Sequence, residues 1–335
     1  MTISPVLGVA VVGAGGVGAL HLAAASRVEG VRLVAVCDVD ERRARSAARE
    51  YGTEVEWASS LEQALEIDGV DAVVVCTPNN THAAVGRAVL EAGKHVLMEK
   101  PLALDLESAD ELLDLAAASD LVLACGHTHR HYDYARAVYD AIPDSVGEPV
   151  FARLSLGAGW IWGGWDAWVL DPVRSGGHIL HNGVHGIDLV SWWLRDRPVE
   201  VAAVGQTVTS GALPTSAYGE VVLRFSRGAG AVVEMSRGDR PKNGASRSVV
   251  VTGDLGMLSI SGGDWGGEIR TETDTSPLGF DGQAGFDRQL ATFASAASGG
   301  DAAAVTSGSD GRVAVAVALA AERSIREGRA VPVSA

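Results

Sequence analysis

Short apolar runs alternate with amphipathic segments along the first part of the chain. Residues 6–12 form a continuous apolar run, which is typical of a strand covered on both faces. A helical pattern of apolar positions follows from residue 17 to about residue 28. Further apolar runs, separated by helical patterns, occupy residues 31–37, 71–76, 95–98 and 121–125. Strands and helices that alternate at this spacing predict a doubly wound parallel sheet.

After residue 125 the pattern changes to strands in which apolar and polar residues alternate. These candidate strands occupy residues 150–156, 199–208, 218–225, 231–235 and 248–251. Alternation of this kind favours a largely antiparallel sheet. Helical patterns end near residues 142 and 194, and two more, at about 285–297 and 309–327, close the chain. We therefore expect an α/β protein with a nucleotide-binding domain at residues 1–124 and a second α/β domain at residues 125–335.

The first strand runs directly into Gly-Ala-Gly-Gly-Val-Gly at residues 13–18, and a helix follows. A G-x-G-x-x-G sequence between a strand and a helix is the pattern of a dinucleotide-binding turn. Gly13 allows the tight turn, Gly15 lets a pyrophosphate approach the backbone, and Gly18 allows the helix to pack closely on the strand. The helix start offers free N–H groups to the phosphates. The candidate cofactor contacts here are Gly13, Gly15, Gly16, Val17 and Gly18.

Asp38 directly follows the second predicted strand, twenty residues after Gly18. A carboxylate at this place accepts hydrogen bonds from a ribose 2′-hydroxyl and repels a 2′-phosphate. We therefore predict NAD as the cofactor and consider NADP less favoured. Arg42 and Arg43 are the counterargument, because an arginine near this position can accommodate a 2′-phosphate.

Polar side chains follow the next two strands, at the edge of a parallel sheet where ligands bind. The strand at residues 95–98 is followed by Glu99, Lys100 and Pro101, and the proline stops the pairing of the strand. We expect Lys100 to face the junction of cofactor and substrate. Further cofactor contacts are expected at Thr77, Pro78, Asn79, His82 and Glu99.

Two segments in the second half carry aromatic and imidazole groups. Residues 157–168 are rich in glycine and contain four of the eight tryptophans, namely Trp160, Trp162, Trp165 and Trp168. Such a segment suits either a lid that stacks on sugar-like or aromatic rings, or a packed loop pinned by its own aromatics. His181 and His185 share a face if the following segment is helical, and Asn182 lies between them. Histidine clusters can bind zinc, but no carboxylate or cysteine completes a ligand set, so we expect no metal.

Composition narrows the classes of partner. The chain has 335 residues, of which 47% are hydrophobic and 21% charged, and a net charge of −15. This charge disfavours nucleic acid and anionic membranes as partners. The cysteines, at positions 37, 76 and 125, are odd in number and lack C-x-x-C spacing, which favours reduced thiols. We find no secretory signal pattern and no apolar run of transmembrane length, and therefore expect a cytoplasmic protein.

Taken together, these motifs resemble the Gfo/Idh/MocA oxidoreductases. The resemblance covers nearly the whole chain and is carried by the glycine turn with His21, Cys76-Thr77-Pro78-Asn79, Ala92-Gly93-Lys94-His95-Val96, Glu99-Lys100-Pro101 and Gly176-Gly177…Gly183-x-His185-x-x-Asp188. It implies a Rossmann domain and a substrate-binding α/β domain whose open sheet makes a homodimer or homotetramer. It also implies NAD(P)-dependent oxidation or reduction of a secondary hydroxyl or ketone in a sugar, glycoside or cyclitol, with Lys100 as catalytic lysine and His185 as proton-transfer residue.

The chain departs from the family pattern at His181, where relatives commonly have an aspartate that touches the substrate. We expect His181 to orient the substrate and to take part in the site with Lys100 and His185. Expected substrate contacts are Lys100, His127, Trp160, Trp162, Trp165, Trp168, His181, Asn182 and His185. The Gly-His-Thr sequence containing His127 resembles that of relatives that oxidise aromatic cis-dihydrodiols or cyclic hemiacetals, which is an alternative substrate class. A non-catalytic dinucleotide-sensing regulator is a further alternative.

Overall fold

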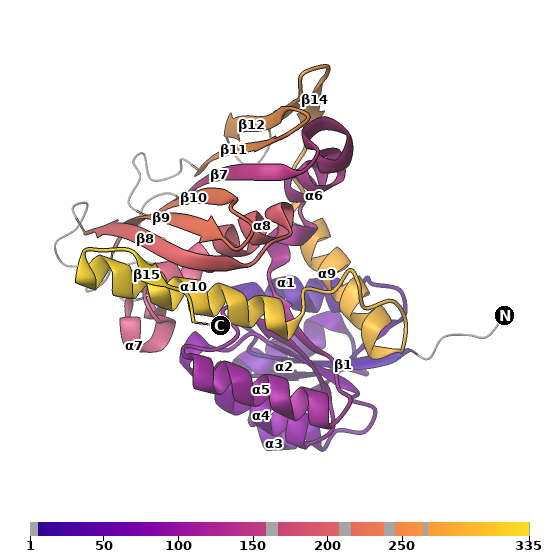
Figure 1. Ribbon diagram of the computed structural model, residues 1–335. Helices are drawn as coiled ribbons and strands as arrows, with labels where there is room; N and C mark the ends of the chain where they lie inside the picture. Colours follow the sequence, from indigo (N-terminus) through magenta and orange to yellow (C-terminus); the bar gives the residue numbers. More distant parts are fainter. Residues whose placement is uncertain (1–5, 159–166, 208–215, 238–244, 264–266, 335) are drawn as a thin grey trace. The chain divides into compact units, whose positions relative to one another are not determined.

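The computed structural model describes residues 6–158, 167–207, 216–237, 245–263 and 267–334. The chain forms two compact units, each made from two separate stretches (Figure 1). The first unit contains residues 1–131 and 282–312, and the second contains residues 132–281 and 313–335. Each unit is discontinuous in sequence, so one boundary position in the chain cannot separate the two units. The predicted domain boundary after residue 124 stays a prediction.

The first unit is built on a six-stranded parallel sheet with the order β3-β2-β1-β4-β5-β6. Its strands are β1 (Leu7–Val12), β2 (Val31–Cys37), β3 (Glu56–Ala58), β4 (Ala72–Val75), β5 (His95–Glu99) and β6 (Leu123–Gly126). Its helices are α1 (Gly16–Ala25), α2 (Glu41–Tyr51), α3 (Leu61–Leu65), α4 (His82–Glu91), α5 (Leu106–Ala118) and α9 (Gly282–Ala297). The strand order reverses direction between β1 and β4, which is the point where such sheets bind ligands.

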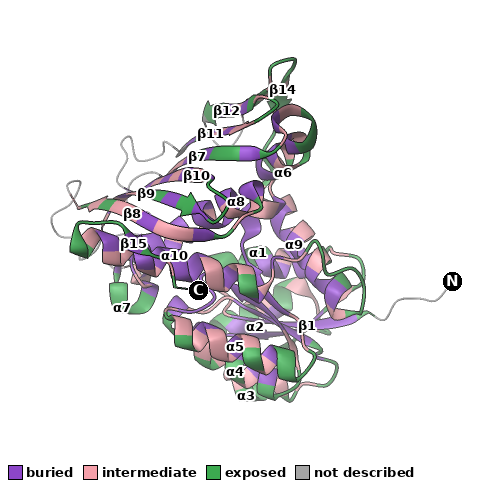
Figure 2. Cartoon of the chain, viewed as in Figure 1, coloured by how far each residue is buried: buried purple, intermediate pink, exposed green. Residues whose placement is uncertain are grey.

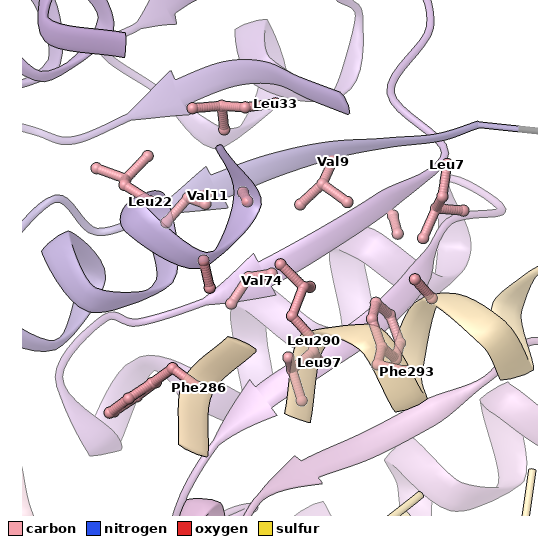
Figure 3. Packing of buried hydrophobic residues seen from close by; sticks show 14 of the residues in the cluster. Leu7, Val9, Val11, Leu22, Leu33, Val74, Leu97, Phe286, Leu290 and Phe293 are labelled. Carbon is pink, nitrogen blue, oxygen red and sulfur yellow. The ribbon is translucent and has the colours of Figure 1, made fainter. Parts of the chain in front are cut away.

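Apolar side chains on both faces explain why the central strands are fully buried. Every residue of β1 and β4 is buried, as the continuous apolar runs predict (Figure 2). Helix α9, from late in the chain, packs against α1 and contributes Phe286, Leu290 and Phe293 to the same core as Val9 and Val74 (Figure 3). The first unit therefore depends on a helix that lies about 150 residues beyond its last strand.

The second unit contains a nine-stranded sheet with the order β14-β13-β12-β11-β7-β10-β9-β8-β15. These strands are β7 (Pro149–Ala158), β8 (Pro198–Gln206), β9 (Tyr218–Phe225), β10 (Gly230–Ser236), β11 (Ala245–Gly253), β12 (Met257–Gly263), β13 (Gly267–Arg270), β14 (Thr275–Leu278) and β15 (Val331–Pro332). All neighbouring pairs are antiparallel except β7 and β10, which run parallel. The prediction of an α/β fold with a parallel sheet and a mostly antiparallel one is confirmed.

The helices of the second unit are α6 (Asp133–Ala141), α7 (Pro172–Ser175), α8 (Val184–Leu194) and most of α10 (Gly308–Glu327). Helix α8 packs on β7 and β10, where Gly186 fits closely because a Cβ there would lie 2.5 Å from a methyl group of Val233. Short 3₁₀ turns occur at Asn79–Thr81, Thr128–His131 and Trp168–Leu170, and π turns at Ile142–Val146 and Ile179–Gly183.

The condition under which His181 and His185 would share a helix face is not met. His181 lies in the π turn Ile179–Gly183 and His185 lies in the first turn of α8, so the segment is not one regular α-helix. A π turn has a wider backbone than an α-helix, and such turns often occur at functional sites. Spacing of four residues therefore does not by itself describe the relation of the two rings.

Candidate active site

The glycine turn after β1 has the form that a bound pyrophosphate requires. Gly13 has a φ of +96°, and a Cβ there would lie 2.6 Å from the Cys76 carbonyl oxygen. A Cβ at Gly18 would lie 1.8 Å from the carbonyl oxygen of Gly13. A Cβ at Gly15 or Gly16 would meet nothing within 4 Å, so the side of the turn at the start of α1 is open. This open cradle fits the dinucleotide phosphates, whose charge the helix start favours.

Asp38 at the end of β2 is buried and supports the same turn. Its Oδ2 accepts a hydrogen bond of 2.9 Å from the Ala14 backbone N–H, and its Oδ1 accepts one of 2.9 Å from Asp40 N–H. The Arg43 guanidinium also donates to both oxygens, at 3.0 and 3.1 Å. The predicted ribose-binding carboxylate is thus at the glycine turn, and Arg43 is its direct neighbour.

The ends of β4, β5 and β6 lie side by side in the first unit. Strand register pairs Val75 of β4 with Met98 of β5, and Glu99 of β5 with Gly126 of β6. The residues that follow each strand therefore meet at one edge of the sheet. This register brings together the predicted site residues Thr77, Lys100 and His127.

Glu99, the residue before Lys100, belongs to a buried network of polar groups. The Glu99 carboxylate contacts His21 Nε2 of helix α1 through Oε1 at 2.8 Å, and its Oε2 accepts a hydrogen bond of 3.1 Å from the Lys100 backbone N–H. Burial by itself would raise the pKa of Glu99, but the His21 contact and Lys100 outweigh it, and the pKa lies below its usual value. Glu99 therefore anchors Lys100 to helix α1; its direct contact with cofactor stays a prediction.

His82 also faces this network, although it is the first residue of α4. Its Nδ1 lies 2.7 Å from the Pro101 carbonyl oxygen and its Nε2 lies 3.0 Å from the Thr77 carbonyl oxygen. Thr81 Oγ1 donates at 2.7 Å to Thr77 Oγ1 or to the Pro78 carbonyl oxygen. The peptide bond between Lys100 and Pro101 is cis. The strand-end loops that carry Thr77 and Lys100 are thus joined through one imidazole ring.

The second unit contains His178, His181 and His185. His181 is buried and meets the Trp168 ring edge-on, with ring centroids 5.4 Å apart. Asn182 Nδ2 lies 3.2 Å from His178 Nδ1, and His185 is half-buried in the first turn of α8. The side chain of Trp168 therefore meets that of His181, and the side chain of Asn182 meets that of His178. Trp160, Trp162 and Trp165 lie outside the described residues.

Sequence reasoning missed Arg237, which follows β10 and is only 3% exposed. Its Nε donates to His178 Nδ1 at 2.9 Å, and its Nη1 donates to the Val169 carbonyl oxygen at 3.2 Å. No ion pair joins this guanidinium to a carboxylate among the described parts of the chain, and burial lowers its pKa to about 10. Nothing in the local pattern marks a strand-end arginine as buried, so only its tertiary contacts could identify it.

Lys100 belongs to the first unit and His185 to the second, so their joint action stays a proposal. Within the residues that the structure describes, no three His, Cys, Asp or Glu side chains are grouped to hold a metal ion. No described helix is both long and apolar enough to cross a membrane.

Comparison with known proteins gives two family matches. Residues 7–127 match the oxidoreductase family described as having an NAD-binding Rossmann fold, and residues 136–259 match the GFO/IDH/MocA C-terminal domain. Inositol 2-dehydrogenase of Rhizobium meliloti is 30% identical over 337 residues, covering 96% of this chain and 98% of that protein. Myo-inositol 2-dehydrogenase of Thermotoga maritima is 28% identical over 345 residues, covering 96% and 97% respectively.

Among solved structures, GenD2 from gentamicin A biosynthesis, in complex with NAD, superposes with a TM-score of 0.86. That protein is 26% identical, and the match covers 100% of this chain and 98% of the other. These matches confirm the predicted family, the NAD-binding fold and the assignment to oxidoreductases.

Proposed function

Because this chain belongs to the Gfo/Idh/MocA oxidoreductase family, we propose that it transfers a hydride between NAD and a secondary hydroxyl or ketone of a sugar, glycoside or cyclitol. The observation that carries this proposal is the position of Lys100. It directly follows β5, its backbone is held by buried Glu99, and Thr77 and His127 follow the neighbouring strands. The inositol dehydrogenases to which the chain is similar support the substrate class.

Oxidation of a secondary alcohol releases a hydride and a proton, and bound NAD accepts the hydride at its nicotinamide ring. The chain has to remove the hydroxyl proton as the carbonyl forms. We assign Lys100 to polarise the substrate oxygen and relay the proton, and His185 to act as general acid and base. His181, Asn182 and Trp168 orient the ring of the substrate, since an aromatic edge and amide groups suit an alicyclic polyol.

The cofactor contacts follow from the first unit. The open side of the glycine turn, at Gly15 to Val17, binds the pyrophosphate, and Asp38 accepts hydrogen bonds from the adenine-side ribose. Thr77, Pro78 and Asn79, at the end of β4, contact the nicotinamide side. His82 and Glu99 hold the loops at this edge of the sheet in place, through the buried contacts of His82 with Pro101 and of Glu99 with His21.

The test is NADH formation with NAD, and then with NADP, across inositols, aldoses, glycosides and aromatic cis-dihydrodiols. Turnover of inositols or another polyol class, with NAD preferred, supports the proposal. Turnover of dihydrodiols alone favours the second candidate, a cyclic non-sugar alcohol, for which the aromatic contact of Trp168 with His181 is the motivating observation. Tight NADH binding without turnover of any alcohol would instead support a dinucleotide sensor.

The open face of the second sheet supports a homodimer or homotetramer. Exposed apolar side chains occur on several of its strands, including Phe151, Val204, Val222 and Met257. Apolar patches of this kind usually mark an interface. Sedimentation velocity with Val222→Glu tests this, because a charge there should shift an assembly toward monomer. A cytoplasmic location stays a prediction.

A further inference from the structure

Two buried histidines approach the loop that carries Lys100, and their partners differ in kind. His21 is 0% exposed and contacts one carboxylate oxygen, Glu99 Oε1. His82 is 1% exposed and contacts two backbone carbonyl oxygens, those of Thr77 and Pro101. The number and type of acceptors around an imidazole decide which of its nitrogens carry protons.

The surroundings of His21 favour a neutral ring. Its Nδ1 is buried and has no hydrogen-bond partner among the described residues. A cationic ring would place an N–H group there without an acceptor, and a buried unpaired donor is costly. A neutral ring with its proton on Nε2 donates to Glu99 and leaves only a lone pair at Nδ1. In that tautomer, the contact of His21 with Glu99 is a hydrogen bond from Nε2–H to Oε1.

The surroundings of His82 favour the opposite state. A carbonyl oxygen can only accept, so both ring nitrogens must donate to satisfy contacts of 2.7 and 3.0 Å. A neutral ring has one N–H group, and its other nitrogen would then direct a lone pair at a carbonyl oxygen at hydrogen-bond distance. An imidazolium satisfies both acceptors.

The charges near His82 act in both directions. The pKa of His82 lies below its usual value because burial, the largest effect, outweighs the Pro101 and Thr77 carbonyls and Glu99, which raise it; Lys100 lowers it further. The pKa of Glu99 lies below its usual value, so this carboxylate is the anion of the network at neutral pH. Burial and Glu99 both raise the pKa of Cys76, which keeps that thiol neutral. The two carbonyl contacts, which a neutral ring does not satisfy, are therefore the reason to assign a positive charge to His82 against the net effect of burial.

We propose that His82 is an imidazolium whose hydrogen bonds to Thr77 and Pro101 position Lys100. The role of Lys100 rests on the proposed function, but the charge state of His82 does not. The ring connects the loop after β4 to the residue that directly follows Lys100, while Glu99 holds the Lys100 N–H from the other side. His82 is thus a positioning residue for Lys100.

The charge state can be measured by correlating imidazole protons and nitrogens in NMR spectra of the full chain labelled with ¹⁵N-histidine. We expect both ring nitrogens of His82 to show the ¹⁵N shift of a protonated nitrogen at pH 7. One ring nitrogen of His21 should show the ¹⁵N shift of an unprotonated nitrogen. An unprotonated ring nitrogen on His82, or two protonated ring nitrogens on His21, overturns the proposal. His82→Gln and His21→Gln identify the signals; if either variant does not fold, nuclear Overhauser contacts of the ring protons with Pro101 or Glu99 identify them.

The positioning role is tested by kinetics of His82→Gln, which keeps a donor but cannot reach both carbonyls. We expect kcat to fall at least about tenfold, with a shifted pH profile, while the Kd for NADH changes less than about threefold. The matched control is His95→Gln at the start of β5, where the ring accepts a hydrogen bond from Val122 N–H. Equal losses in both variants, or ordinary kcat in His82→Gln, contradict the positioning role.

Turnover of alcohols tests the proposed function, and the NMR measurement tests the charge state of His82 separately. If the wild-type enzyme oxidises none of the alcohols, the proposed function fails, and the NMR measurement still decides the charge state of His82. If the wild type turns over substrate and His82 has an unprotonated ring nitrogen, the proposed function stands and the inference about His82 is overturned.

Discussion

Arg43 Nη1 lies 3.0 Å from Oδ1 and 3.1 Å from Oδ2 of Asp38, so one guanidinium nitrogen donates to both oxygens of a buried carboxylate. The same oxygens accept from the Ala14 and Asp40 backbone N–H groups. A carboxylate has about four acceptor positions, and these contacts use all of them. A ribose hydroxyl that binds Asp38 must therefore displace the Arg43 side chain.

We predict that Arg43→Ala tightens NADH binding and weakens NADPH binding. Removing the competing guanidinium frees Asp38 for the ribose, and it also removes the cation best placed to meet a 2′-phosphate. The expected change is a few-fold in each direction, as is usual for a half-exposed ion pair. Titration of NADH and NADPH fluorescence measures it. Arg42→Ala is the control, because the contact of Arg42 in this region is made by its backbone N–H; an equal effect of both variants would contradict the prediction.

Asp38→Ala should narrow the preference for NAD over NADP. The substitution removes the acceptor for the ribose hydroxyl and the charge that repels a 2′-phosphate, so the ratio of kcat/KM for the two cofactors should fall by about tenfold. Steady-state kinetics with both cofactors gives this ratio. If the ratio is unchanged, cofactor choice is determined by other residues.

Lys100→Ala should abolish turnover while NADH still binds. The loss should be about a hundredfold or more in kcat, because the variant lacks the group that polarises the oxygen and relays the proton. Binding of NADH should change little, since the phosphate and ribose contacts come from the turn after β1 and from Asp38. Lys94→Ala, in the turn before β5, is the control. Ordinary activity in Lys100→Ala would remove Lys100 from the mechanism.

Arg237→Met should leave stability nearly unchanged and raise the KM for substrate. Replacing a buried charge by an apolar side chain of similar length offsets the lost hydrogen bonds, so the free energy of unfolding should change by about 1 kcal/mol or less. Without the Arg237 Nε–H donor, His178 and its neighbour Asn182 lose their fixed orientation. Arg237→Ala should cost about 2 to 3 kcal/mol because it leaves a cavity. Urea denaturation compares the two variants, and equal stability losses would contradict this account.

Glu99→Gln should destabilise the protein at pH 7 and have less effect in acid. The pKa of Glu99 is lower in the folded chain than the unfolded value of 4.5, so its charged form stabilises the fold above that pH. This contribution is lost as the pH falls through the folded pKa. We expect the variant to lose about 2 kcal/mol at pH 7 and progressively less below pH 4.5. Urea denaturation at several pH values measures this; Glu91→Gln, an exposed site on α4, should show no such trend.

The sequence predicted those features that depend on local order along the chain. The glycine turn, Asp38 at the end of β2 and Lys100 at the end of β5 follow from short motifs that adjoin apolar strands. Such motifs work because a strand, a tight turn and a helix start are each defined by residues close together in sequence. The NAD-binding fold and the two kinds of sheet were predictable for the same reason, whereas the family was predicted from the resemblance of several short motifs.

Only the tertiary structure decided which groups meet across long sequence separations. Helix α9 joins the first unit through Phe286, Leu290 and Phe293, although its pattern shows only an amphipathic helix near the end of the chain. The contacts of Arg237 with His178 and of His21 with Glu99 span 59 and 78 residues. Hydrophobic periodicity specifies which face of an element is buried, but not which polar group it meets, because that depends on strand order and on loop conformation. The charge states proposed for His21 and His82 depend on those partners, so the folded chain determines them and the sequence pattern does not.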